Sequence, residues 1–329
     1  MENHNQIKFS ILIPAYKSRY LKEAIESVLG QSYKNLELIV VDDCSPEDLN
    51  SIVDSFSDPR MSYYRNEKNY GAINVVDNWN KCLGYATGDY VICMGDDDKL
   101  LPSCLSDYVD IIHKHPGLYV YHTRTLIINE ESEIWHIQEL RPEYETGYSL
   151  WWHRWMGGRG WQFIGDFLFE RQHLINEGGF FFLPLAWASD DISAVRAALP
   201  HGIANVSIPG FCYRKNEMTI SVSSDERLKA NAALKEMEWY NKMLDIAQTQ
   251  DEVDIILKDL IKRYSINRFQ NKILGSFSKD INDNPSHLLF WYKNRNSFYL
   301  LKSIIVSTYI NALKYQVYKT LKKLFHKFR

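Results

Sequence analysis

The segment Gly88-Asp89-Tyr90-Val91-Ile92-Cys93-Met94-Gly95-Asp96-Asp97-Asp98-Lys99-Leu100-Leu101-Pro102 joins a short apolar run directly to three consecutive carboxylates. The run from Tyr90 to Met94 is bounded by turn residues and rich in β-forming residues, so it predicts a buried strand. At its end, three ionised Asp side chains repel one another. A hard divalent cation with oxygen ligands relieves this repulsion and can hold a phosphate group. A solvated acidic turn is the alternative, because Asp is favoured in turns.

Four further short runs predict strands, and helical patterns separate them along the chain. The runs cover residues 9–14, 36–41, 61–65 and 118–122. Because strands and helices alternate at short intervals, we expect an open α/β sheet with right-handed crossovers.

The first two helices are expected to begin near Ser18 and Ser45, since Ser is favoured at helix N-caps. The loop after the first strand contains neither a G-x-G-x-x-G pattern nor a G-x-x-x-x-G-K-[ST] pattern. Their absence disfavours dinucleotide dehydrogenases and P-loop NTPases. If a nucleotide diphosphate binds in this part of the chain, a metal ion must do much of the work of holding it.

Polar clusters follow three of the predicted strands. They are Pro14-Ala15-Tyr16, Asp42-Asp43 and Asp96-Asp97-Asp98. Ligands of open α/β sheets bind at the carboxyl ends of the strands, so these clusters are expected to form one composite site.

Composition describes an ordinary globular chain with an uneven charge. The 329 residues are 45% hydrophobic and 24% charged, and the length allows one large domain with a smaller one. The first 283 residues hold 29 Lys and Arg against 41 Asp and Glu, a net charge of −12, whereas the remainder has nine basic and no acidic residues. The sequence thus predicts an acidic body with a basic tail.

The five cysteines are widely spaced and form neither a zinc pattern nor a CxxC motif. This predicts reduced thiols in a cytoplasmic protein. No secretion signal opens the chain, and no window has the roughly 18 uninterrupted apolar residues of a spanning helix. We therefore expect a cytoplasmic protein that can lie peripherally on the inner face of the cytoplasmic membrane.

Six pieces of the first 105 residues form a recurring pattern when taken together. They are Ser10–Tyr16, Ser27–Tyr33, Leu38–Ser45, Asn69–Gly71, Ala86–Tyr90 and Gly95–Pro102. In order and spacing they resemble glycosyltransferase family 2, whose members are inverting enzymes with the GT-A fold. The resemblance implies a Rossmann-like open mixed sheet flanked by helices. It also implies a catalytic domain over 1–224, divided into a nucleotide-binding half, 1–105, and an acceptor half, 106–224. Residues 225–329 are expected to form a helical region with a basic amphipathic tail.

The same resemblance assigns the donor site. Pro14-Ala15-Tyr16 would line the nucleoside pocket, and Asp43 would hydrogen-bond the base or ribose. The acidic triplet would be the family's DXD-type motif, with Asp97 as the main ligand of Mn²⁺ or Mg²⁺. Asp96 would lie near the ribose or the metal, and Asp98 would support them.

Two positions depart from the commonest family pattern. Gly95 stands where the first Asp of the motif is often found, so fewer direct carboxylates are expected in the metal shell. Trp79-Asn80 stands where the family often has an Arg-Asn pair that contacts the donor.

A later block, Glu177-Gly178-Gly179-Phe180 followed by Ser189-Asp190-Asp191 and Arg196, resembles the family's catalytic segment. Inverting transfer needs a base to take the proton of the attacking hydroxyl. The spacing to Arg196 favours Asp190, with Asp191 as the second choice. Alternatively, Ser189-Asp190 only caps the following helix.

Aromatic and basic residues between and after these blocks suggest further contacts. Trp152, Trp155 and Trp161 are candidates for an acceptor-binding surface, or else for a packed aromatic cluster. Arg214 and Lys215 lie in a segment that resembles a late Tyr-Arg motif of the family. One of them is expected at the donor diphosphate or at an acceptor phosphate, with Arg214 as the donor-site candidate and a solvated basic turn as the alternative.

Beyond residue 225 the pattern is helical. Its last part interleaves lysines with apolar residues, which favours binding to an anionic membrane surface. Nucleic acid is the rival partner of a basic tail, but the acidic body argues against it. Packing of the helix on its own domain is the other alternative.

Together these features predict a metal-dependent, inverting glycosyltransferase that uses a nucleotide-diphosphate sugar, and the resemblance to the family implies a UDP-linked donor. Its acceptor would be a saccharide, lipid-linked or free, in the synthesis of O-antigen, capsule or a similar bacterial surface polysaccharide. A non-catalytic nucleotide-sugar-binding protein and a membrane-associated scaffold remain the alternatives.

Overall fold

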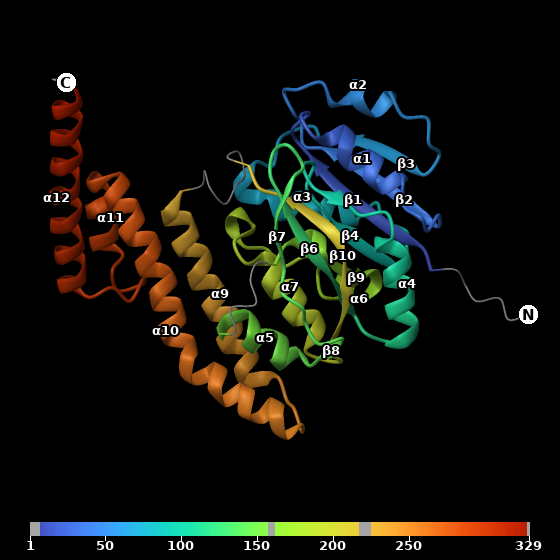
Figure 1. The fold of residues 1–329 in the computed structure, drawn as a ribbon. Coiled ribbons are helices and arrows are strands. Elements are labelled where there is room, and N and C mark those ends of the chain that lie inside the picture. Colours follow the sequence, from blue (N-terminus) through green and yellow to red (C-terminus); the bar gives the residue numbers. More distant parts are fainter. Residues whose placement is uncertain (1–6, 157–161, 217–224, 328–329) are drawn as a thin grey trace, which may run out of the picture. The chain divides into compact units, whose positions relative to one another are not determined.

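The computed structural model describes residues 7–156, 162–216 and 225–327, with side chains up to residue 318 (Figure 1). Contacts divide the chain into two compact units, Met1–Val222 with Thr249–Leu257, and Ser223–Gln248 with Lys258–Arg329. The first unit contains the β-sheet, and the second is helical.

The first half of the sheet is parallel, with strands in the order β3-β2-β1-β4. Right-handed crossovers place α1 and α2 on one face of these strands and α3 on the other. The elements are β1 (Phe9–Ala15), α1 (Leu21–Leu29), β2 (Leu36–Asp42), α2 (Leu49–Asp54), β3 (Met61–Arg65), the 3₁₀ turn η1 (Ala72–Asn74), α3 (Val75–Leu83) and β4 (Tyr90–Cys93).

The second half of the sheet is mixed. β4 pairs antiparallel with β9, β9 pairs antiparallel with β6, and β6 runs parallel to β10. The short β5 pairs with the end of β10, whereas β7 and β8 pair with β6 and β10. The structure thereby confirms the expected mixed α/β sheet. The elements are β5 (Lys99–Leu100), α4 (Cys104–Lys114), β6 (Val120–Ile128), β7 (Ile134–Ile137), β8 (Tyr144–Glu145), α5 (Gly147–Met156), η2 (Ile164–Asp166), β9 (Phe167–Glu170), α6 (Arg171–Asn176), η3 (Pro184–Ala186), α7 (Ser189–Ala198) and β10 (Ile203–Arg214).

The central strands are apolar on both faces because helices cover both faces. Ile11 and Ile13 of β1 pack with Ile25 of α1 and Tyr108 of α4 in one fully buried cluster. Leu12, which points to the opposite face, is also completely buried. This two-sided burial explains why the run shows no alternation of apolar and polar residues.

The helix starts expected at Ser18 and Ser45 are wrong. α1 has Tyr20 at its N-cap and no side-chain cap, and α2 is capped by the carboxylate of Asp48. The hydroxyl of Ser45 instead donates to the carbonyl oxygen of Tyr16 at 2.6 Å, so it ties together the loops after β1 and β2.

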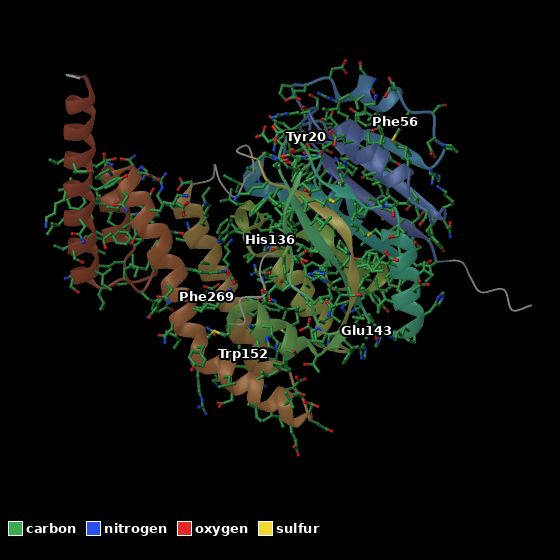
Figure 2. The ribbon with its side chains drawn as sticks, in the orientation of Figure 1. Tyr20, Phe56, His136, Glu143, Trp152 and Phe269 are labelled. Carbon is green, nitrogen blue, oxygen red and sulfur yellow. The ribbon has the colours of Figure 1, made fainter. Side chains whose placement is uncertain are left out.

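The helical unit has its own core. Phe277, Trp291 and Ile305 are almost fully buried in it, and the carboxylate of Asp280 accepts a hydrogen bond from the Trp291 indole at 2.6 Å. Phe269, also fully buried, is labelled among the side chains in Figure 2. Within the described residues, no helix is both long and apolar enough to cross a bilayer. The helices are α9 (Glu226–Ile246), α10 (Glu252–Asp283), η4 (Pro285–His287), α11 (Leu288–Lys293) and α12 (Lys302–Lys327).

Candidate active site

The ends of β1 and β4 are joined by one carboxylate. Asp96 accepts hydrogen bonds from the backbone N–H groups of Tyr16 and Lys17, both at 2.7 Å and both on the same oxygen, Oδ2. The end of β2 is attached to the same loop, since the backbone N–H of Asp43 donates to the carbonyl oxygen of Ala15 at 2.8 Å. The three clusters that follow the strands therefore lie together, as the topology predicts.

The carboxylates of the acidic turn have different surroundings. Burial and the charge of Asp97 raise the pKa of Asp96 to about 6, and the same two causes raise the pKa of Asp98 well above its ordinary value. Both oxygens of Asp98 accept backbone N–H groups, from Arg214 at 3.0 Å and from Gly95 at 3.2 Å. Asp98 therefore fastens the turn to the end of β10.

Asp97 is the least buried of the three. Its Oδ2 accepts a hydrogen bond from the amide nitrogen of Asn216 at 2.8 Å, and Lys17 Nζ lies 4.0 Å from the same oxygen. A Cβ added at Gly95 would lie 2.8 Å from Oδ1 of Asp97 and 2.9 Å from Oδ2 of Asp98. An Asp at position 95 would therefore displace the carboxylates that follow it.

These residues fit a divalent cation only in part. Among the described side chains, no group of three or more His, Cys, Asp and Glu is arranged to hold a metal ion. Asp97 with the second oxygen of Asp96 nevertheless offers two carboxylates, and Asp97 already raises the pKa of Asp96. A cation is favoured where carboxylates oppose one another's ionisation. The remaining ligands would have to come from a bound phosphate and water.

The predicted nucleoside residues line the end of β1. Pro14 is half-buried, Ala15 is fully buried, and Tyr16 is 42% exposed, so only the Tyr16 ring offers a large accessible surface. Asp43 is buried and accepts hydrogen bonds from its own chain, including the backbone N–H groups of Tyr70 at 3.0 Å and Gly71 at 3.3 Å. Asp43 thus orders the loop after β3, and its contact with a donor stays a prediction.

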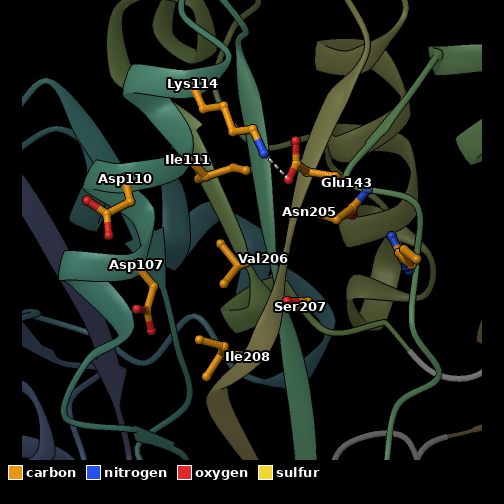
Figure 3. Close-up of a pocket in the computed structure, with 10 residues that line it drawn as sticks. Asp107, Asp110, Ile111, Lys114, Glu143, Asn205, Val206, Ser207 and Ile208 are labelled. Atoms are coloured by element: carbon orange, nitrogen blue, oxygen red, sulfur yellow. Dashed lines mark hydrogen bonds and ion pairs between the residues drawn. The ribbon is translucent and has the colours of Figure 1, made fainter.

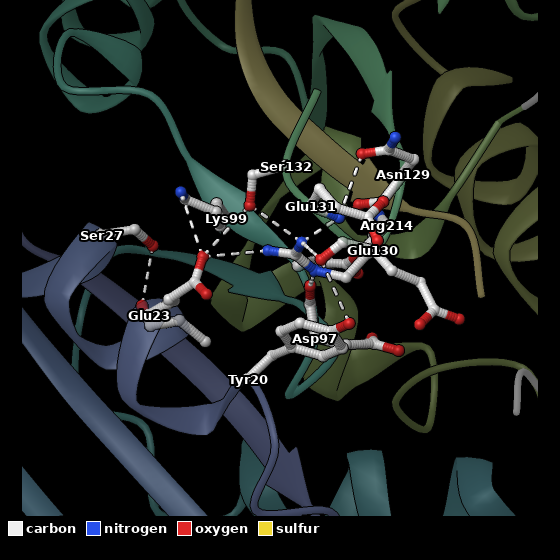
Figure 4. A network of polar contacts seen from close by, with 12 residues as sticks. Tyr20, Glu23, Ser27, Asp97, Lys99, Asn129, Glu130, Glu131, Ser132 and Arg214 are labelled. Carbon is white, nitrogen blue, oxygen red and sulfur yellow. Dashed lines mark hydrogen bonds and ion pairs between the residues drawn. The ribbon is translucent and has the colours of Figure 1, made fainter. Parts of the chain in front are cut away.

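Arg214 is the centre of a buried polar network beside the acidic turn (Figure 4). Its side chain has no exposed surface, and its guanidinium carbon lies 4.0 Å from the centre of the Tyr20 ring. Its hydrogen bonds join α1, the acidic turn and the loop between β6 and β7. The acceptors are Asp97 O at 2.9 Å, Asn129 O at 3.1 Å, Glu130 O at 3.2 Å, Ser132 Oγ at 2.9 Å and Glu23 Oε2 at 3.1 Å.

This network gives Arg214 a structural part that the sequence does not reveal. Its guanidinium holds the carbonyl of Asp97, and a direct contact with a donor diphosphate stays a prediction. Glu23 was not among the predicted site residues. Nothing in the sequence around Glu23, on the helix after β1, indicated that it lies at the site, because its partners Arg214 and Lys99 are distant in sequence.

The candidate base lies in the first turn of α7. The N-cap of this helix is Ala188, which has no side-chain cap, so Ser189 and Asp190 already belong to the helix. Asp190 is half-buried, and burial together with the charge of Asp191 raises its pKa to about 8. Asp191 is buried and paired with Arg154 Nε at 2.6 Å. This pairing leaves Asp190 as the more available carboxylate.

The aromatic candidates for acceptor binding also differ in how deeply they are buried. Trp155 is 7% exposed and packs edge-on against Trp151, with ring centres 5.4 Å apart. Trp152 is half-buried, and Trp161 lies outside the described residues. Within α5, Trp152 is therefore the candidate with an accessible ring, and acceptor binding by all three remains a prediction.

A hollow lies near the start of β10, whereas the acidic turn contacts the end of that strand (Figure 3). Its volume is about 370 Å³, and its floor includes Ile111 and Val206. Lys114 and Glu143 on its rim form an ion pair with each other. None of the predicted site residues lines it.

A mixed α/β sheet with polar clusters at the carboxyl ends of its strands is typical of α/β proteins that bind their ligands at those strand ends. Residues 10–183 match the family described as Glycosyl transferase family 2, which is more than half of the chain, so the chain belongs to this family. The resemblance noted in the sequence is confirmed.

Two curated relatives match over about a third of the chain each. One, from Escherichia coli K12, is named "Putative colanic acid biosynthesis glycosyl transferase WcaA" and is 40% identical over 113 residues, which are 33% of this chain and 39% of the relative. Another, from Campylobacter jejuni, is named "GalNAc(5)-diNAcBac-PP-undecaprenol beta-1,3-glucosyltransferase" and is 37% identical over 102 residues, 30% of this chain and 32% of the relative. The matches thus span less than half the length of these relatives.

The fold is similar to that of a solved structure, Staphylococcus aureus TarS 1–349 in complex with UDP-GlcNAc. The TM-score is 0.62, and the alignment covers 95% of this chain and 92% of TarS at 17% identity. At this identity the likeness establishes the GT-A fold alone.

Proposed function

We propose that this protein is an inverting glycosyltransferase that moves a sugar from a UDP-linked donor to a saccharide acceptor during synthesis of a bacterial surface polysaccharide. The observation that carries the proposal is the junction of the acidic turn with the loop after β1, made by Asp96 and two backbone N–H groups. It brings Asp97 to the strand ends where the family binds its donor. Membership of the family and the names of the relatives support the proposal.

In this proposal the donor lies along the carboxyl edge, with Tyr16 against the nucleoside. Asp97 and Asp96 would hold Mn²⁺ or Mg²⁺, and Asp98 would support the turn. When bound, the cation would supply positive charge against the diphosphate leaving group. UDP as the nucleotide is supported by the similar fold of TarS, which was solved in complex with UDP-GlcNAc and with UDP.

The chemical step is an in-line displacement at the anomeric carbon. The acceptor hydroxyl oxygen forms the new bond, the bond from carbon to the diphosphate oxygen breaks, and the diphosphate leaves with that electron pair. Asp190 takes the hydroxyl proton, so it must be ionised beforehand. With its pKa raised to about 8, the ionised fraction of Asp190 and therefore the rate should increase as pH rises through that value.

The acceptor is proposed to be lipid-linked and the protein to work on the inner face of the cytoplasmic membrane. The relative from Campylobacter jejuni carries an undecaprenol diphosphate saccharide in its name. On α12, Val306, Ile310, Leu313 and Val317 are all more than 40% exposed and recur at helical spacing. Together with a segment that has nine basic and no acidic residues, this stripe suits an anionic lipid surface.

The proposal is tested by measuring hydrolysis and binding of UDP-glucose, UDP-galactose, UDP-GlcNAc and UDP-GalNAc with and without Mn²⁺. Binding of at least one donor that depends on metal, accompanied by slow release of UDP, is expected. Binding without any turnover would favour the non-catalytic alternative. No response to any nucleotide would contradict the proposal.

A further inference from the structure

The segment that leads into the candidate base has an unusual backbone. Leu185, Ala186 and Ala188 have φ angles of 64°, 52° and 74°. Residues other than glycine seldom adopt this left-handed region, and such conformations persist only where the surrounding structure enforces them. Asp190 follows two residues after the last of them. Something must therefore hold this segment in place.

One carboxamide, that of Asn80 on α3, fixes the turn immediately before this segment. Its Oδ1 accepts the backbone N–H of Phe180 at 2.7 Å, and its Nδ2 donates to the carbonyl oxygen of Phe180 at 3.1 Å. Phe180 is 1% exposed, so water cannot replace these bonds without disturbing the packing. The neighbouring Trp79, 9% exposed, packs edge-on against the Phe180 ring at 5.9 Å.

The turn also requires a glycine beside Asn80. Gly179 has a φ of 87°, and a Cβ added there would lie 2.3 Å from Asn80 Oδ1. The Gly-Gly-Phe sequence is thus shaped to receive this carboxamide.

The other side of the turn is fastened to α7, the helix that carries Asp190. Arg196 donates to the carbonyl oxygens of Glu177, at 2.9 Å, and of Gly179. Two serines of the same helix accept backbone N–H groups: Ser193 Oγ from Phe181 at 2.9 Å, and Ser189 Oγ from Leu183 at 3.0 Å. The turn therefore joins α3 to α7 along most of the length of α7.

We propose that Asn80 is a positioning residue for Asp190. Its carboxamide fixes the turn at residues 177–183. Once fixed, this turn holds the left-handed segment and the N-terminal residues of α7 in position. The proposal rests on the proposed role of Asp190 as the base. It assigns to Asn80 a part in the acceptor step.

The substitution Asn80→Asp tests this with little change of volume. A carboxylate still accepts the Phe180 N–H but cannot donate to the Phe180 carbonyl, which it repels. With the UDP-sugar that the protein hydrolyses fastest among UDP-glucose, UDP-galactose, UDP-GlcNAc and UDP-GalNAc, we expect kcat to fall at least tenfold. The donor KM and the affinity for UDP with Mn²⁺ should stay within twofold.

The pH profile separates positioning from a general loss of structure. Asp190 faces Asp191 on its own helix, Arg154 on α5 and Asp166 on η2. If the turn loosens, Asp190 becomes less enclosed, and the rising limb of kcat should move to lower pH. Asp77→Asn, at an exposed position on α3, is the matched control and should change neither kcat nor the profile.

Ser193→Ala, which removes one bond between the turn and α7, is the second variant and should lower kcat about threefold with the same direction of shift. An unchanged kcat in both variants, a fall without a shift of the profile, or an equal loss of UDP affinity would each overturn the proposal. Asp190→Asn separates the assignment of the base from the positioning role of Asn80. If that variant keeps full activity, the assignment of the base is wrong; if it is inactive while Asn80→Asp behaves as wild type, only the positioning role is wrong.

Discussion

Replacing Arg214 by Met should destabilise the catalytic unit strongly. The substitution keeps much of the apolar stem but removes the hydrogen bonds that Arg214 donates to three backbone carbonyl oxygens, one hydroxyl and one carboxylate. Of these acceptors, the Glu23 carboxylate keeps Lys99 as a partner. Removing one partner of a buried charged network typically costs about 3–5 kcal/mol. The Glu23 side chain is 42% exposed, so solvent screens its ion pair with Arg214. Most of the lost stability should therefore come from the backbone carbonyl groups. We therefore expect the lower half of that range, about 3 kcal/mol.

Urea unfolding followed by tryptophan fluorescence measures this loss, and calorimetric titration with UDP and Mn²⁺ measures binding. Arg19→Met is the matched control, because Arg19 is 57% exposed and pairs with the Glu130 side chain of the same loop at 2.8 Å. An exposed pair contributes about 0–1 kcal/mol. If Arg214→Met loses UDP affinity while its stability changes no more than that of the control, Arg214 contacts the donor directly and the structural account of it is refuted.

Three further predictions concern other parts of the chain. The rising limb of the pH–kcat profile should have its midpoint near pH 8, and Arg154→Met should move it higher, because Arg154 lowers the pKa of Asp190; a midpoint near pH 4 would contradict this. Asp43→Asn should lower the free energy of unfolding by about 2 kcal/mol in thermal denaturation, since charge-assisted bonds to the loop after β3 are weakened; an unchanged melting temperature would show that they contribute little. Ile310→Glu should lower the affinity for phosphatidylglycerol vesicles, measured by sedimentation, about tenfold, because roughly 1–2 kcal/mol of apolar burial is lost. Val253→Glu, at a 62% exposed position, is the control and should leave the affinity unchanged. Equal effects of the two substitutions would refute the proposed membrane face.

The parallel half of the sheet could be predicted closely from the sequence. Residues 61–65 form β3 as predicted, and β1 and β2 extend only one residue beyond the predicted runs. Their apolar runs are determined by burial on both faces, which local sequence records directly. Helix starts were harder, because a serine hydroxyl can bond across loops, as Ser45 does to Tyr16.

The orientation of site residues could not be predicted from local sequence. Asp96, Asp97 and Asp98 are identical in type, but each has different distant partners. Asp96 accepts backbone N–H groups from the loop after β1, and Asp98 accepts one from Arg214 at the end of β10, more than a hundred residues away. Arg214 looked like a phosphate ligand because nothing near it in sequence shows its acceptors. The residue types indicated the chemistry, whereas long-range pairing decided which atoms remain available.

The most direct test compares Asp97→Asn with Asp190→Asn by measuring, on the same samples, Mn²⁺-dependent UDP binding and release of UDP from the best donor. Asp97→Asn should lose metal-dependent binding and turnover together. Asp190→Asn should bind UDP as the wild type does and lose turnover at least a hundredfold. Wild-type turnover in either variant would contradict the account of that residue, and intact metal-dependent binding by Asp97→Asn would show that the acidic turn does not hold the donor through a cation.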